Sequence, residues 1–201
     1  MHGRKSVFAT IGATNHSKQQ REINDFYATD PYAIDLLKKN FPIPKYIWEP
    51  ACGTGNLAKR LSQLGHVVYA SDIIDRGYGA QDDFLKNPTI PLIANQDDFG
   101  IITNPPYTLL TPFVLQALKI LRDGQYLYLF LKTTALESRQ RYEQIYKHTP
   151  PCNILQSIDR ILCAKSDDFD TAKKTLGKGA LAYAWYIWEK GNYTQTNLSW
   201  I

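Results

Sequence analysis

An apolar run that stops at two prolines constrains this chain more than any other stretch. Residues 99–103 (Phe-Gly-Ile-Ile-Thr) are hydrophobic and partly β-branched, which is typical of a buried strand. Asn104, Pro105, Pro106 and Tyr107 follow directly. Proline has a fixed φ and no N–H, so the strand cannot continue past this point. The pattern therefore predicts an amide and an aromatic ring at the carboxyl end of a strand, where open α/β sheets bind ligands.

These groups suit chemistry on a planar amine. The exocyclic amine of an aromatic ring is a weak nucleophile, because its lone pair is delocalised into the ring. The side-chain oxygen of Asn104 and the carbonyl of Pro105 can each accept one N–H, which stabilises the more pyramidal nitrogen of the transition state. Pro106 adds rigidity, and the ring of Tyr107 can stack on a base. A strand followed by a proline-rich turn is the alternative interpretation.

A strand, a glycine-rich turn and a helix lie upstream in the arrangement that binds nucleotides. Residues 45–49 form the strand, which ends at Glu49, and leucines at 57, 61 and 64 give the helix one apolar face. The turn between them contains Pro50, Ala51, Gly53 and Gly55. The two glycines allow the backbone to approach a ligand closely. The third glycine of the dinucleotide fingerprint is missing.

Acidic residues follow the next two predicted strands. Residues 66–71 end at Asp72, and an acidic side chain at this place suits the hydroxyls of a ribose. Asp83 and Phe84 stand at the end of a third strand. There Asp83 could accept a hydrogen bond from an adenine amine while Phe84 packs on the ring. Taken singly, each of these features occurs in any α/β protein.

The remaining pattern predicts one α/β domain over residues 25–201, preceded by a flexible arm over residues 1–24. We expect one helix after Pro31, with Thr29 or Asp30 as the cap, and another after Tyr107, with Thr108 and Thr111 as possible caps. A further helix is expected over residues 135–147. Residues 125–131 are apolar throughout and predict a central strand. Further strands are expected at 153–158 and 180–189, and the last 12 residues read as a polar tail.

Composition limits the class of protein. The 201 residues are 44% hydrophobic and 21% charged, with a net charge of +4, which is compatible with a polyanionic partner. No run approaches the roughly 18 apolar residues of a membrane span. The N-terminus lacks a secretory signal, so we expect a cytoplasmic protein. Cys52, Cys152 and Cys163 are widely spaced and predict neither a metal site nor a disulfide framework.

Residues 159–179 are the least regular stretch and the best candidate for contacts with a substrate. Basic side chains beside an aromatic ring could touch a nucleic-acid backbone and an exposed base. Lys132, at the end of the central strand, could also reach a phosphate, although a solvated lysine is the plainer interpretation. The predicted substrate residues are Tyr107, Lys132, Lys165, Phe169, Lys173 and Lys174.

The Asn-Pro-Pro-Tyr and Glu-Pro-Ala-Cys-Gly-Thr-Gly strings, with residues 26–31, resemble the small adenine-N6 DNA methyltransferases of phages and prophages. The resemblance covers residues 15–190. It implies a Rossmann-like class I methyltransferase fold with a mostly parallel seven-stranded sheet, flanking helices and an antiparallel last strand. It also implies S-adenosylmethionine as cofactor, with Tyr27 and Thr29 at its methionine end. Duplex DNA with the target base flipped out would be the substrate, and Asn104 to Tyr107 the catalytic residues.

Three alternatives stay open. Methylation of RNA adenine or of a protein glutamine would use the same chemistry, and a non-catalytic nucleic-acid-binding module would use the fold alone. The chain shows no stretch that fits a separate target-recognition region. We therefore expect weak sequence preference, a homodimer or an unidentified specificity partner. The resemblance places such a protein in a bacterial or phage-infected host cell.

Overall fold

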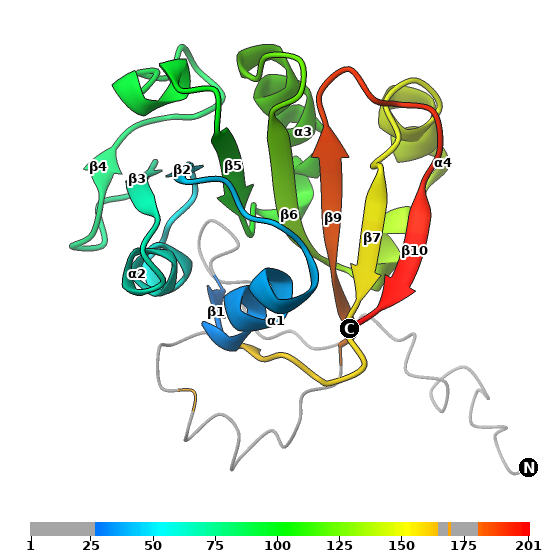
Figure 1. Cartoon of the computed structure of the whole chain (residues 1–201), viewed down its shortest axis with the longest axis horizontal. Helices are drawn as coiled ribbons and strands as arrows, with labels where there is room; N and C mark the ends of the chain where they lie inside the picture. Colours follow the sequence, from blue (N-terminus) through cyan, green and yellow to red (C-terminus); the bar gives the residue numbers. More distant parts are fainter. Residues whose placement is uncertain (1–26, 165–168, 170–180) are drawn as a thin grey trace, which may run out of the picture.

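The computed structural model describes residues 27–164, 169 and 181–201 (Figure 1). The arm expected over residues 1–24 lies outside this part, as do Lys165, Lys173 and Lys174.

The described residues form an eight-stranded sheet in the order β10-β7-β9-β6-β5-β2-β3-β4 (Figure 1). All neighbours are parallel except β9, which runs antiparallel to both β6 and β7. This confirms the predicted mostly parallel α/β sheet. The strands are β2 (Tyr46–Glu49), β3 (Val67–Asp72), β4 (Ala80–Gln81), β5 (Phe99–Thr103), β6 (Tyr126–Lys132), β7 (Asn153–Gln156), β9 (Tyr183–Glu189) and β10 (Asn197–Trp200).

The prediction of a polar tail after residue 189 was wrong for β10. This strand pairs in parallel with β7, from Asn197 opposite Asn153 to Trp200 opposite Gln156, and becomes the eighth strand at the edge of the sheet. All four of its residues are exposed. Its four residues, Asn-Leu-Ser-Trp, alternate polar and apolar, but so short a run next to a polar stretch is too weak a signal to predict a strand.

Helices cover both faces of the sheet (Figure 1). On one face, α1 (Tyr32–Asn40) and α2 (Asn56–Gln63) bury Ile34, Leu37 and Leu61 against β2, β6 and β9. On the other face, α3 (Leu110–Ile120) packs Phe113 and Val114 into a second cluster. Pro31 directly precedes α1, and Oδ1 of Asp30, one of the two expected caps, accepts the backbone N–H of Tyr32 over 3.1 Å.

The continuous helix expected over residues 135–147 was wrong. The chain forms a 3₁₀ turn (Thr133–Leu136), the short α4 (Arg139–Arg141) and one π-helical turn (Tyr142–Tyr146). Ser138 interrupts the run as a cap, because its hydroxyl accepts the N–H of Arg141 over 3.2 Å. The Arg141 guanidinium then donates to the carbonyls of Thr134, Ala135 and Glu137, so it satisfies backbone groups that a continuous helix would use internally.

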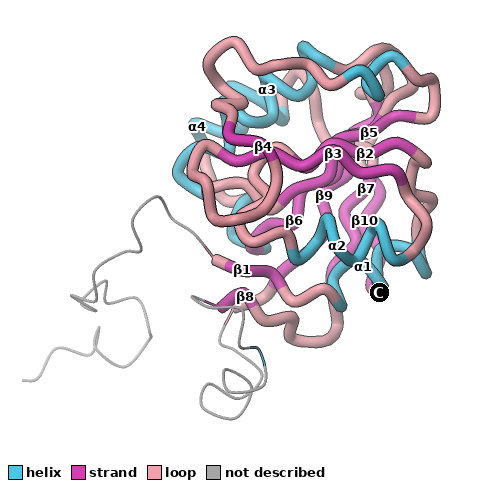
Figure 2. Tube along the Cα trace, turned by 90° about the vertical axis from the view of Figure 1, so that its left-hand side faces the viewer, coloured by secondary structure: helices cyan, strands magenta, loops and turns pink. Residues whose placement is uncertain are grey.

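A separate two-stranded ribbon joins distant parts of the chain (Figure 2). β1 (Ala28–Thr29) pairs antiparallel with β8 (Cys163–Ala164), with Thr29 opposite Cys163. The ribbon lies outside the main sheet, near α1 and α2 (Figure 2). Within the described ranges, no helix is long and apolar enough to cross a membrane.

Candidate functional site

A cavity of about 410 Å³ opens at the carboxyl ends of β2, β3 and β5. This volume lies in the range of small-molecule and cofactor sites. The cavity is lined by almost every residue predicted to bind the cofactor or act in catalysis. These are Tyr27, Thr29, Glu49, Pro50, Ala51, Gly53, Asp72, Asp83, Phe84, Asn104, Pro105, Pro106 and Tyr107.

The glycine-rich turn has two glycines with different roles. Gly53 lines the cavity with a φ of +55°, and its N–H donates to Oδ2 of Asp72 over 2.8 Å. Gly55, by contrast, is not among the cavity-lining residues, although we expected it to approach the ligand. Its φ is +84°, and an added Cβ would collide with the ring of Tyr78. Gly55 therefore serves the turn and the packing of Tyr78 rather than the cavity wall.

Acidic side chains from two strand ends line the cavity. Glu49 is 2% exposed, and burial, reinforced by the negative charge of Asp72, raises the pKa of its carboxyl well above the usual value. Its Oε2 atom is buried without a hydrogen-bond partner among the described residues. Asp72 already accepts the N–H groups of Gly53 and Ile74, at 2.8 and 3.0 Å. Its carboxylate thus shapes the turn, and each oxygen retains a lone pair for a further donor.

The pair predicted to hold a planar ring lies beside an aromatic cluster. Phe84 is 3% exposed and packs on Trp48 and Phe113, with ring centroids 5.2 and 5.0 Å apart. Asp83 uses Oδ1 to accept the N–H of Leu85 over 3.0 Å. Both residues line the cavity, so this end combines an apolar ring surface with a carboxylate.

The amide of Asn104 is held at its nitrogen. Nδ2 donates to the hydroxyl oxygen of Thr29 over 2.8 Å and lies 3.9 Å from the sulfur of Cys163. Oδ1 is buried, and no partner for it occurs among the residues the structure describes. The side chain therefore offers an acceptor at the cavity wall, which is the polarity that the sequence predicted for binding an amine.

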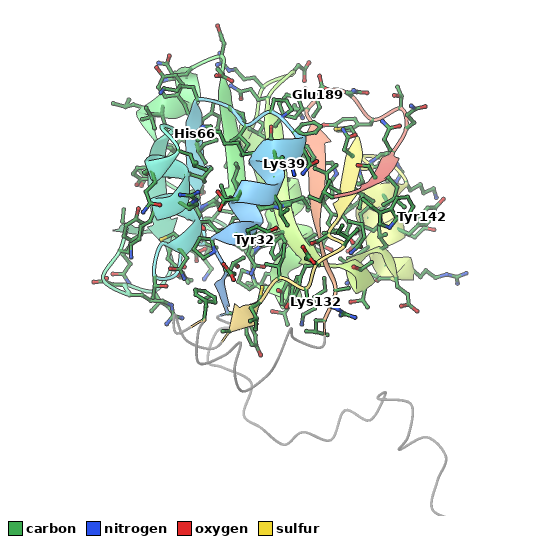
Figure 3. All side chains as sticks on the ribbon, turned by 60° about the horizontal axis from the view of Figure 1, so that its bottom comes forward. Tyr32, Lys39, His66, Lys132, Tyr142 and Glu189 are labelled. Atoms are coloured by element: carbon green, nitrogen blue, oxygen red, sulfur yellow. The ribbon has the colours of Figure 1, made fainter. Side chains whose placement is uncertain are left out.

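Tyr107 sits in a more crowded place than expected. Burial raises the pKa of its phenol above the usual value, and the neighbouring Cys163 and Tyr183 add to the shift. The ammonium of Lys132 lies 4.2 Å from the centre of the Tyr107 ring. Lys132 therefore packs on the predicted base-stacking ring. Figure 3 shows it at the end of the sheet opposite Glu189 and His66.

Some predicted residues make contacts that were not expected, and other cavity-lining residues were not predicted. Phe169, which was predicted to touch the substrate, packs against the buried Leu162 and Ala164. Thr29, which was expected at the cofactor, lines the cavity, and its hydroxyl oxygen also accepts a hydrogen bond from Asn104. Glycine and proline spacing carried no signal for the other lining residues, which are Ala28, Cys52, Thr54, Asn56, Leu57, Ile73, Ile74, Arg76, Leu85, Thr108, Leu109 and Phe113.

Comparison with known proteins identifies the fold. No family model matches the chain, and neither does any curated protein sequence. Among solved structures, a Listeria monocytogenes protein assigned to the class I S-adenosylmethionine-dependent methyltransferases superposes with a TM-score of 0.53 at 17% identity. The match covers 85% of this chain and 62% of that one, so this chain spans less than two thirds of the Listeria protein.

Two further structures have the same fold. The N-methyltransferase NodS of Bradyrhizobium japonicum matches with a TM-score of 0.51 and 12% identity, over 81% of this chain and 94% of NodS. The type IIG restriction endonuclease BpuSI matches with a TM-score of 0.51 and 12% identity, over 84% of this chain and 25% of the enzyme. The chain therefore has the Rossmann-like class I methyltransferase fold.

Proposed function

We propose that this protein transfers a methyl group from S-adenosylmethionine to the exocyclic N6 of adenine in DNA. The observation that carries the proposal is the orientation of Asn104, whose buried Oδ1 has no partner in the described part of the chain and belongs to the cavity wall. An unsatisfied buried acceptor in a cavity points to a ligand that donates a hydrogen bond. An amine supplies that donor.

The cavity fits the proposed cofactor by volume and charge. S-adenosylmethionine carries a sulfonium and an ammonium, and the acidic wall of Glu49, Asp72 and Asp83 suits both positive charges. The unpartnered Oε2 of Glu49 could accept from the ammonium, and Asp72 from the ribose. Phe84 and Asp83 would hold the adenine. When bound, the cofactor supplies an electrophilic methyl group on its sulfonium sulfur.

The chain's own residues would act by positioning the substrate. Asn104 Oδ1 and the Pro105 carbonyl would each accept one N–H of the target amine and stabilise the charge that develops on its nitrogen. No general base is required, because the amine loses its proton readily once it is alkylated. The ring of Tyr107 would stack on the flipped base. Since Lys132 lies over one face of that ring, we propose that the base uses the other face.

The DNA and adenine parts of the proposal rest on the resemblance of the Asn-Pro-Pro-Tyr segment. The net charge of +4 is compatible with a polyanion. One structural neighbour, BpuSI, is named as a restriction endonuclease, an enzyme that acts on DNA. We further propose that the recognition sequence in DNA is short or weakly preferred, or that a homodimer or a partner protein supplies the specificity.

Methyl transfer from methyl-labelled S-adenosylmethionine tests the proposal. Unmethylated duplex DNA, single-stranded DNA, RNA and a protein extract serve as parallel acceptors, each with wild type, Asn104→Ala and Asn95→Ala. Asn95 is exposed and outside the cavity wall, so it is the matched control. We expect label in duplex DNA. Loss of one transition-state acceptor should lower the rate roughly 100-fold or more in Asn104→Ala, with cofactor binding retained.

Each other outcome has a defined meaning. Label only in RNA or protein would overturn the DNA substrate and keep the chemistry. Equal rates for Asn104→Ala and wild type would remove the catalytic role of the amide. Cofactor binding without transfer to any acceptor would favour a binding module.

A further inference from the structure

The ribbon of β1 and β8 contacts the nitrogen end of the Asn104 amide. Nδ2 donates to Thr29 Oγ1 over 2.8 Å and approaches Cys163 Sγ at 3.9 Å. Thr29 and Cys163 face each other as paired residues of the ribbon. Thr29 and Cys163 are 134 positions apart in the sequence, yet both approach the same side-chain nitrogen.

Both ribbon side chains act as acceptors toward that nitrogen. The Thr29 hydroxyl oxygen accepts from Asn104, and the thiol of Cys163 lies 4.0 Å from the same oxygen. Burial raises the pKa of the Cys163 thiol to about 11, so the sulfur is neutral at physiological pH. A neutral thiol is a weak acceptor and a weak donor. The hydroxyl of Thr29 is thus the stronger partner of the amide.

Holding the nitrogen decides what the other end of the amide presents. A side-chain amide has donors at one end and an acceptor at the other. With Nδ2 engaged by the ribbon, Oδ1 is the atom left for a ligand, and it is buried with no partner within the described ranges. An amide rotated by half a turn would present N–H donors instead and would suit a ring nitrogen or a carbonyl oxygen.

We infer that Thr29, supported by Cys163, is a positioning residue that fixes the orientation of the Asn104 amide. The site is thereby restricted to substrates whose methyl-accepting nitrogen carries an N–H. This inference rests on the proposed function and deepens it. It explains how a site of this kind distinguishes an exocyclic amine from a ring nitrogen of the same base. It also gives Thr29 a role in addition to the cofactor contact that the resemblance implied.

Two substitutions at Thr29 separate hydrogen bonding from packing. Thr29→Val keeps the shape and removes the acceptor, whereas Thr29→Ser keeps the acceptor. Thr103→Val is the matched control, because Thr103 directly precedes Asn104, is fully buried and has an Oγ1 without a partner in the described part of the chain. Calorimetry of S-adenosylmethionine binding and thermal unfolding show whether each full-length variant is folded and loaded.

The first readout is independent of any substrate. The side-chain NH₂ resonances of Asn104, assigned by their absence in Asn104→Ala, report the bond directly in isotope-labelled protein. We expect slow hydrogen exchange in wild type, Thr29→Ser and Thr103→Val, and exchange at least roughly tenfold faster in Thr29→Val. Unchanged exchange in Thr29→Val would overturn the inference.

The second readout is methyl transfer. Loss of one orienting hydrogen bond should lower kcat roughly 10- to 100-fold in Thr29→Val, with the cofactor Kd changed less than about threefold. Thr29→Ser and Thr103→Val should stay within about threefold of wild type. A Thr29→Ser variant as impaired as Thr29→Val would show a packing role and contradict the inference. If wild type transfers no methyl group to any acceptor, the proposed function fails, and the exchange data alone decide the orientation of Asn104.

Discussion

Three buried side-chain oxygens illustrate how a ligand site differs from an imperfection of the core. Glu49 Oε2, Thr103 Oγ1 and Asn104 Oδ1 all lack hydrogen-bond partners among the described residues. A buried polar atom without a partner costs about 1–3 kcal/mol. Glu49 and Asn104 belong to the cavity wall and Thr103 does not. We therefore propose that Glu49 Oε2 and Asn104 Oδ1 bind a ligand. The unpartnered Thr103 Oγ1 is instead a local cost of folding.

Glu49 should oppose stability in the free protein and support cofactor binding. Burial raises the pKa of Glu49 in the folded state above its value in the unfolded chain. The folded protein thus binds this proton more tightly, and stability falls as pH rises from the unfolded pKa through the folded pKa. We expect Glu49→Gln to raise the melting temperature of the cofactor-free protein at pH 7.5 and to have little effect near pH 4, where both states are protonated.

Calorimetry completes the Glu49 prediction. The same substitution removes a charged acceptor for the cofactor ammonium, so S-adenosylmethionine should bind roughly 10- to 100-fold more weakly. Wild-type affinity should also rise with pH until Glu49 is ionised. A Glu49→Gln variant that melts lower than wild type at neutral pH and binds cofactor normally would show a structural role instead.

At the scale of elements, the turn between β2 and α2 depends on a glycine for two separable reasons. Gly55 adopts a φ of +84°, which costs a residue with a side chain about 1–2 kcal/mol. A Cβ there would also collide with the ring of Tyr78. Gly65 has a similar φ of +91° with nothing within 4 Å of the added Cβ. The two positions therefore share the backbone strain, and the collision occurs only at Gly55.

Alanine at each glycine measures the difference. Gly65→Ala should lower the free energy of unfolding by about 1 kcal/mol, and Gly55→Ala by at least about twice as much. For a chain of this size, 1 kcal/mol corresponds to about 2–4 °C in melting temperature. Denaturant unfolding of both variants beside wild type provides the comparison. Equal losses would mean that Tyr78 moves aside without cost.

Local signals account for which elements the sequence could predict. The abrupt stop at Pro105 and the glycine turn before α2 predicted β5 and β2 because each depends on a few adjacent residues. The ribbon that pairs Thr29 with Cys163 was missed. Its strands are two residues long, too short to show a repeat of apolar residues, and they pair with distant residues. β10 was missed because its alternating pattern covers only four residues, too few to stand out from a polar tail. Both depend on pairing with distant residues.

At the scale of the whole molecule, the order of the strands assembles the site. β2, β3 and β5 are neighbours in the sheet, so Glu49, Asp72 and Asn104 reach one cavity although the sequence separates them. The parallel-sheet rule made that convergence predictable. The position of Lys132 over the Tyr107 ring was not, because it depends on where β6 lies beside β5 and on the packing of a flexible side chain.

The nucleosides of a host genome give the most direct measurement of the proposed activity. The wild-type protein and Asn104→Ala would each be expressed in a bacterium that lacks its own DNA methyltransferases. The DNA would be digested and analysed by mass spectrometry. We expect N6-methyladenine with wild type and its loss with Asn104→Ala, because Oδ1 of Asn104 is the acceptor proposed for the target amine. DNA that stays unmethylated, or that carries only N4-methylcytosine, would contradict the assignment to adenine N6.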